Sequence, residues 1–180
     1  MGIDFWTGAF LIVILTGVYT VLGGLKAVVY TETIQAIILL IGATATLIYG
    51  LIAVGGWDQM VATAGPGFMN IWKPATHPDF PWTGVVFGAP ILGIWYWCTD
   101  QNIVQRVLSA KNVSEARKGT IFAGFLKLTP LFLFVIPGVI AFCLTQPGVP
   151  EGVRLDLASK DSALPELVKT LLPSGLKGMV

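Results

Sequence analysis

Four long stretches with almost no charged side chain constrain the fold of this chain more than any other feature. They lie at residues 5–25, 33–57, 80–99 and 116–145. Each is about 20 residues or longer, which is enough for a helix to cross a hydrocarbon core of about 30 Å. Because lipid offers the backbone no hydrogen-bond partner, such segments have to satisfy their own backbone as helices. We therefore expect an all-α membrane protein with four transmembrane helices.

The composition excludes several classes of protein. Only 12% of the 180 residues are charged, about half of what a soluble domain carries. The net charge of +1 argues against nucleic acid as a partner. Cys98 and Cys143 both lie in apolar stretches, which argues against a disulfide framework or a metal cluster. The sequence shows no phosphate loop, nucleophile elbow or metal-ligand spacing, so we expect neither an enzyme nor a bound cofactor.

The connections between the apolar stretches differ in charge and so indicate an orientation. Residues 100–118 carry four basic side chains, whereas residues 58–81 carry Lys73 alone. The positive-inside rule places the loop 100–118 and the short connection 26–32 in the cytoplasm. The loop 58–81 and the segment 148–180 are then extracellular. We expect a multi-pass protein of the cell membrane, in which the segment 148–180 leads toward a further, missing helix.

Small residues recur at a spacing of four within two of the stretches. One series is Gly42, Thr46 and Gly50, and the other is Gly84 and Gly88. Small residues at this spacing allow membrane helices to approach closely. Both series are candidate helix–helix contacts, although such spacings also arise by chance in a glycine-rich membrane chain.

Lys127 is an ammonium group inside the last apolar stretch. It stands ten residues beyond Arg117, so it lies about 15 Å into the membrane at about 1.5 Å per residue. A charge at that depth costs about 2.5–3.5 kcal/mol, and such residues usually line a cavity or a pathway. A lysine that reaches back to the interface, or that pairs with an acid on a neighbouring helix, is the alternative. We favour the functional interpretation because of the depth.

Aromatic and polar residues mark the end of the third stretch. The ring of Tyr96 is suited to stack on the apolar face of a sugar, and its hydroxyl to bond a sugar oxygen. Interfacial anchoring is the alternative for Tyr96 and Trp97, since Tyr and Trp gather at membrane surfaces. The polar residues 99–102 would satisfy freed backbone groups or meet Arg106 in a broken helix. A helix that simply ends in water is the alternative.

Glu32 opens the second stretch, between Thr31 and Thr33. An acidic side chain near a helix N-terminus is stabilised by the helix dipole. We therefore expect Glu32 to cap this helix, with a role in an ion path or a gate as the alternative.

Several of these motifs resemble a known family. Residues 19–28, with Thr31, Glu32 and Gln35, resemble the signature of the solute:sodium symporters. Residues 95–106 are similar to the aromatic motif of the sodium/glucose and sodium/inositol cotransporter branch. Residues 109–114 and 125–128 continue the similarity. The resemblance covers nearly the whole chain and is weakest at 58–80 and 148–175.

The resemblance implies a fold of the leucine-transporter type, with two inverted repeats of five helices each. The four stretches then correspond to core helices four to seven. The third stretch, 80–99, would be the broken helix that opens the second repeat. Solute sites in such folds lie near the middle of the membrane, at broken helices.

The resemblance also implies roles for individual residues. Tyr96 corresponds to a gate tyrosine that stacks on the sugar, Trp97 to a tryptophan near the sugar, and Lys127 to a donor to a sugar hydroxyl. Relatives often carry a hydroxyl or amide residue three positions before that tyrosine, where this chain has Gly93. This difference bears on which sugar is bound.

Three charged residues are implied to act in gating or ion coupling. Glu32 corresponds to an acidic position linked to cation coupling or gating, and Asp100 and Arg106 to charges with a structural or gating role. The sodium site of the family lies on core helices one and eight, which are missing here, so we expect no metal site in this chain. Sodium enters as the coupling ion rather than as a resident cofactor.

We therefore expect an internal fragment of a sodium-coupled sugar symporter, with a sugar of the glucose or galactose kind, sodium and the lipid bilayer as its partners. A symporter of inositol or another small solute is the first alternative. A transporter-like membrane sensor domain is the second, and a signalling extension in the full gene would reveal it. A membrane enzyme is a distant further alternative.

Overall fold

We describe the fold from a computed structural model, which places residues 4–157 and 159–178. Ala158, Met179 and Val180, all within the predicted external segment 148–180, lie outside the described residues. Across the described residues the secondary structure is helical, with no strand. The helices are α1 (Phe5–Val54), α2 (Trp57–Ala64), α3 (Pro66–Met69), α4 (Trp82–Cys98), α5 (Gln101–Leu108), α6 (Val113–Leu126), the π-helix Leu131–Val135, α7 (Ile136–Leu144), the 3-10 turn Lys160–Ser162, α8 (Ala163–Leu171) and α9 (Ser174–Lys177).

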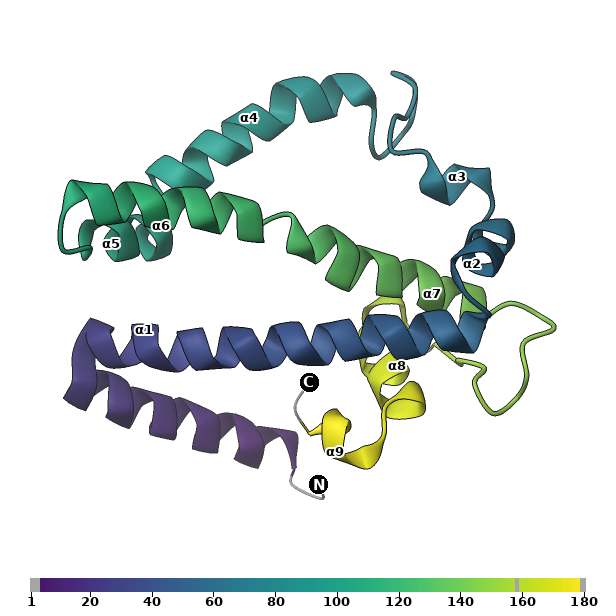
Figure 1. Cartoon of the computed structure of the whole chain (residues 1–180), viewed down its shortest axis with the longest axis horizontal. Helices are drawn as coiled ribbons and strands as arrows, with labels where there is room; N and C mark the ends of the chain where they lie inside the picture. Colours follow the sequence, from purple (N-terminus) through teal and green to yellow (C-terminus); the bar gives the residue numbers. More distant parts are fainter. Residues whose placement is uncertain (1–3, 158, 179–180) are drawn as a thin grey trace.

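Helix α1 is a hairpin of two arms that reverse direction at Gly24 (Figure 1). Gly24 has φ 58° and ψ −160°, a conformation that is essentially restricted to glycine. A Cβ atom at Gly23 would come within 2.3 Å of the Cβ of Ala27. The sequence around this turn therefore requires two consecutive glycines.

The predicted connection at 26–32 is not a separate loop, because these residues are helical. The second arm begins at Leu25 rather than at residue 33, and ends at Val54 before the positive-φ glycines Gly55 and Gly56. The arm is about 45 Å long at 1.5 Å per residue, longer than a hydrocarbon core of about 30 Å. We therefore place the first turns of this arm, which carry Lys26 and Glu32, outside the hydrocarbon core.

The third and fourth stretches also form helices, but only the fourth is interrupted. Helix α4 is continuous, so the break predicted within 80–99 is absent, and the chain leaves the helical path only at Thr99 and Asp100, before α5 begins. In the fourth stretch, α6 ends at Leu126, and a turn at Lys127 and Leu128 leads to the π-helix and then α7. Proline 130 adds to this interruption, because it has no N–H to donate to the preceding turn.

The connections divide between two ends of the bundle (Figure 1). One end, called here the α5 end, holds the Gly24 turn, α5 and the loop to α6. The other, called the α8 end, holds α2, α3 and α8 beside the last turns of α1 and α7. The predicted loop 58–81 thus contains two short helices. Residues 100–118 and 58–81 lie at opposite ends of the described helices, and their placement on the two sides of the membrane stays a prediction.

Most of the buried apolar side chains lie at the α8 end. The cluster comprises Met60, Ile140, Ala141, Cys143, Leu144, Leu155 and Leu167. On α1 the buried residues are Gly42, Ala43, Thr46 and Gly50, and a Cβ atom at Gly50 would lie 3.1 Å from Cγ2 of Ile140. The predicted contact along Gly42, Thr46 and Gly50 is therefore present. A Cβ atom at Gly88 would meet nothing within 4 Å, and one at Gly84 would meet only Pro81, so neither marks a helix–helix contact among the described residues.

Large apolar side chains cover the outside of the described helices. On α4, which stands apart from α7 (Figure 1), Phe87 and Ile91 are 70% and 71% exposed. By length and composition, Phe5–Val54 and Val113–Leu144 are long and apolar enough to cross a membrane. Such surfaces are typical of helices that face lipid or further helices.

Candidate functional site

A cleft of about 280 Å³ lies between α6 and the corner where α4 ends and α5 begins, called here the α4–α5 corner. Tyr96 and Trp97 line it from α4, and Arg106 from α5. The α6 wall is made of small side chains, which leave the space open: Ala116, Gly119, Thr120 and Ala123. Lys127, just beyond the end of α6, lies at the boundary of the same cleft.

Lys127 and Tyr96 contact each other directly. The Lys127 Nζ lies 3.6 Å from the centroid of the Tyr96 ring, well within the distance of a cation–π interaction. The Tyr96 ring meets Trp97 edge-on, with centroids 5.5 Å apart and an interplanar angle of 82°. The structure therefore brings together the three residues predicted to bind solute. Both aromatic side chains are half-buried, whereas the Lys127 side chain is exposed.

The interruption after α4 positions the aromatic pair. The Asp100 carboxylate accepts hydrogen bonds from the backbone N–H of Asn102 at 3.0 Å and of Ile103 at 3.3 Å. It therefore caps the N-terminus of α5 and satisfies backbone groups that the interruption leaves open. Asp100 does not line the cleft and does not pair with Arg106 within the described structure.

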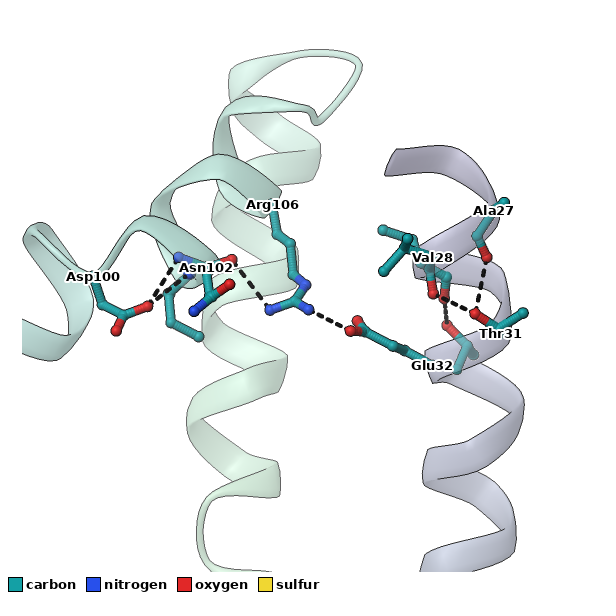
Figure 2. Close-up of polar contacts among 10 residues, drawn as sticks. Ala27, Val28, Thr31, Glu32, Asp100, Asn102 and Arg106 are labelled. Atoms are coloured by element: carbon teal, nitrogen blue, oxygen red, sulfur yellow. Dashed lines mark hydrogen bonds and ion pairs between the residues drawn. The ribbon is translucent and has the colours of Figure 1, made fainter. Parts of the chain in front are cut away.

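Arg106 joins α5 to the second arm of α1 (Figure 2). Its Nη2 lies 2.5 Å from Oε1 of Glu32, and its Nη1 donates to the Asn102 carbonyl at 3.2 Å. The capping role predicted for Glu32 is wrong, because the helix already begins at Leu25. Glu32 instead pairs across 74 positions of sequence. The two side chains are 37% and 43% exposed, so the pair is partly open to its surroundings.

The charges around the cleft leave one cation without an ion-pair partner. Arg106 is neutralised by Glu32, and Glu115 pairs with Lys118 at 2.9 Å. Within the described residues no carboxylate lies within ion-pair distance of Lys127. The cleft therefore presents one positive charge, and that charge lies on the face of the Tyr96 ring.

Sequence reasoning missed the α6 wall of the cleft and the partner of Glu32. The wall has a signal in the sequence, because Ala116, Gly119, Thr120 and Ala123 follow the spacing of a single helix face. The Glu32–Arg106 pair has none, since nothing in the sequence relates two charges on separate helices. Gly93, which differs from the family pattern, does not line the cleft.

The described residues contain no cluster of three or more His, Cys, Asp or Glu side chains that could hold a metal ion. The polar groups that line the cleft are Lys127, Arg106, the Thr120 hydroxyl and the Glu115 carboxylate, beside the faces of two aromatic rings. This combination suits a neutral polar solute.

Comparison with known proteins identifies the family. The sequence model of the sodium:solute symporter family matches residues 1–180. The chain belongs to this family. The chain is 35% identical to sodium/glucose cotransporter 1 of the pig (Sus scrofa), over 100% of its own length. Human sodium/myo-inositol cotransporter 2 is 39% identical over 92% of the chain, and rat solute carrier family 5 member 4 is 34% identical over all of it.

The resemblance drawn from the sequence motifs is therefore confirmed for the family and for the glucose and inositol branch. The matched regions make up 32%, 28% and 31% of the pig, human and rat proteins. The chain thus spans about a third of the length of the curated relatives that it matches.

Proposed function

We propose that this chain is an internal part of a sodium-coupled symporter that carries a sugar, of the glucose or galactose kind, across the cell membrane by alternating access. The observation that supports it best is the contact of Lys127 with the Tyr96 ring in the cleft between α4 and α6. The contact joins the last turn of α4 to the interruption that follows α6, and solute sites of secondary transporters lie at interrupted helices. Transport, rather than an enzymatic reaction, is the proposed activity.

The cleft has the chemistry that a sugar requires. The Tyr96 ring offers an apolar face to the C–H groups of a pyranose, and Trp97 extends that surface. Lys127 has three N–H donors, which suit the hydroxyl oxygens at the rim of the same ring. A volume of about 280 Å³ is near the lower end of the range for small-molecule sites. The solute is therefore a compact, neutral and hydroxyl-rich molecule.

We further propose that α1, α4–α5 and α6–α7 are core helices four to seven of an inverted-repeat fold, with the sodium site on helices outside these residues. The α5 end faces the cytoplasm, as the basic residues of 100–118 indicate. The pair between Glu32 and Arg106 then ties two core helices on the cytoplasmic side of the solute. It serves as a latch whose opening accompanies solute release, and Asp100 holds α5 in place for it.

Inositol is the second candidate solute. The human sodium/myo-inositol cotransporter 2 shares 39% of aligned residues with this chain, and a cyclic polyol offers the same hydroxyl acceptors as a sugar. Uptake of labelled glucose, galactose and myo-inositol by the full-length protein in parallel assays separates the two candidates.

Substitutions at Lys127 and Tyr96 in the full-length protein test the proposal. A hydrogen bond from a charged donor contributes about 1.5–3 kcal/mol, or on the order of 10- to 100-fold in affinity. Lys127→Ala should weaken the apparent affinity for sugar by about that factor. Tyr96→Ala should lower sodium-driven uptake more than Tyr96→Phe, which keeps the ring. The readout is uptake at several sugar concentrations with surface expression measured alongside.

Lys111→Ala, in the exposed loop before α6, is the matched control and should transport like the wild type. If Lys127→Ala reached the membrane and transported with unchanged affinity and rate, the placement of the solute in this cleft would be wrong.

A further inference from the structure

We propose that Lys127 also determines the charge selectivity of the site: its ammonium covers the face of the Tyr96 ring and excludes cationic solutes, quaternary ammonium compounds above all. This inference rests on the proposed function, because it assumes that the cleft binds the solute. It adds a reason why the site carries a positive charge although its proposed solute is neutral.

The first reason for this proposal is the position of the Lys127 ammonium on the Tyr96 ring. An exposed aromatic face beside a small cleft is the usual binding surface for an organic cation, which it attracts within about 6 Å of the ring centroid. Here the Nζ of Lys127 already lies 3.6 Å from that centroid. The protein thus supplies its own cation at the position that a foreign ammonium group would occupy.

The second reason is that Lys127 has no ion-pair partner within the described part of the chain, whereas the other charges at the cleft are paired. The other charges at the cleft are paired, Arg106 with Glu32 and Glu115 with Lys118. Lys127 has no ion-pair partner among the described residues, so the cleft is positive at the ring. A cationic solute would meet a like charge there, and two like charges in contact repel each other. A lysine paired with a carboxylate would not have this effect.

A neutral polyol meets the same lysine differently. Its hydroxyl oxygens accept hydrogen bonds from the ammonium, while its C–H groups lie against the face of the ring that the ammonium does not cover. One side chain therefore stabilises the neutral solute and opposes the charged one, which is how selective sites reject close competitors. Lys127 is thus both a donor to the solute and a barrier to cations.

The test is binding of radiolabelled tetramethylammonium to the purified full-length protein. Lys127→Met removes the charge but keeps the length of the side chain, and it should create binding that the wild type and Lys127→Arg lack. Adding Tyr96→Ala to Lys127→Met should weaken this new binding by about 3- to 30-fold, the range of a cation–π contact. Lys111→Met, an exposed lysine outside the cleft, should behave like the wild type.

Sodium-driven uptake of labelled sugar gives an independent readout that requires no variant at the site. Excess tetramethylammonium should leave wild-type uptake unchanged. Inhibition of the wild type would overturn the inference, as would a Lys127→Met protein that melts like the wild type yet binds no tetramethylammonium. Binding that the loss of the Tyr96 ring does not weaken would also overturn it.

The two proposals fail in distinguishable ways. A wild-type protein that takes up neither sugar nor inositol with sodium would contradict the proposed function. A wild-type protein that transports one of them, while Lys127→Met gains no affinity for the cation, would contradict only the selectivity role of Lys127. Lys127→Gln provides a second uncharged variant if Lys127→Met does not reach the membrane.

Discussion

At the α8 end, α1, α2, α7 and α8 bury a continuous apolar cluster around Ile140 and Leu167. At the α5 end, by contrast, the helices meet through the pair between Glu32 and Arg106, the Asp100 cap and the Lys127–Tyr96 contact. Dense apolar packing fixes one arrangement, because a packed core has few alternative states. Partly exposed polar contacts are weaker and more readily exchanged. The comparison indicates that the α8 end maintains the fold, whereas the α5 end contains the proposed site and the contacts that exchange more readily.

The two ends should differ most in the side of the membrane that each faces, with the α5 end in the cytoplasm and the loop 58–81 outside the cell. In a protein lacking Cys98 and Cys143, an impermeant maleimide added to intact cells should label Ala75→Cys and leave Lys111→Cys unlabelled. Both positions lie in exposed loops, so only the membrane should separate them. Permeabilised cells, in which both should react, provide the control. Labelling of position 111 from outside would reverse the orientation.

The next largest effect concerns packing at the α8 end. Ile140→Ala should lower the free energy of unfolding by about 2 kcal/mol or slightly more, the lower part of the range for large-to-small changes in a core. The lower part applies because lipid tails are as apolar as the protein interior, so mainly packing is lost. Ile140 is fully buried, whereas Ile121 on α6 is 63% exposed.

Ile121→Ala is the matched control, and it should change stability by less than about 0.5 kcal/mol. Both values can be measured by titrating the purified protein from mild detergent into dodecyl sulfate. Equal losses at the two positions would mean that stability is not concentrated at the α8 end.

A substitution in the α1 hairpin should have an intermediate effect. Gly24→Ala places a side chain at φ 58°, which costs about 1–3 kcal/mol in a region that only glycine occupies readily. Gly17→Ala lies within the first arm, where a Cβ atom would meet nothing within 4 Å, and should raise stability by up to about 1 kcal/mol. Changes of opposite sign in the free energy of unfolding for the two variants, in the same unfolding assay, would support the turn at Gly24. A neutral Gly24→Ala would contradict it.

The smallest effect on stability should come from the pair between Glu32 and Arg106. Because both side chains are more than a third exposed, a double-mutant cycle with Glu32→Ala and Arg106→Ala should give a coupling of at most about 1 kcal/mol. Transport should be more sensitive: Arg106→Ala should lower the maximal rate of uptake, or expression, more than the apparent affinity for sugar. A large loss of affinity with a normal maximal rate would instead place Arg106 against the solute.

The helices could be predicted from the sequence largely because lipid leaves few choices for long apolar stretches. The turn could not be placed correctly, because Lys26 and Glu32 were interpreted as the limits of the membrane although the helix continues through both. The glycine pair at residues 23 and 24 was the better indicator of the reversal. Helices α2 and α3 were missed because the loop is rich in glycine and proline, which usually mark irregular structure.

For the site, the residue types suggested which side chains matter, but not how they meet. A lysine deep in an apolar stretch and a tyrosine at a helix interruption each indicated a role. That the two side chains contact each other depends on the packing of α6 against the α4–α5 corner, which no local pattern specifies. The same is true of Glu32 and Arg106, which lie on different helices.

The most direct test of the account is whether solute occupies the cleft between α4 and α6. Ala123 lines that cleft from α6, whereas Ser114, on the first turn of the same helix, is exposed and does not line it. In the full-length protein lacking Cys98 and Cys143, each position is replaced by cysteine and its modification by a maleimide is timed in inside-out vesicles. Sodium together with the transported sugar should slow the modification of Ala123→Cys several-fold and leave that of Ser114→Cys unchanged. Equal rates at Ala123→Cys with and without sugar, under conditions in which the protein transports it, would contradict the account.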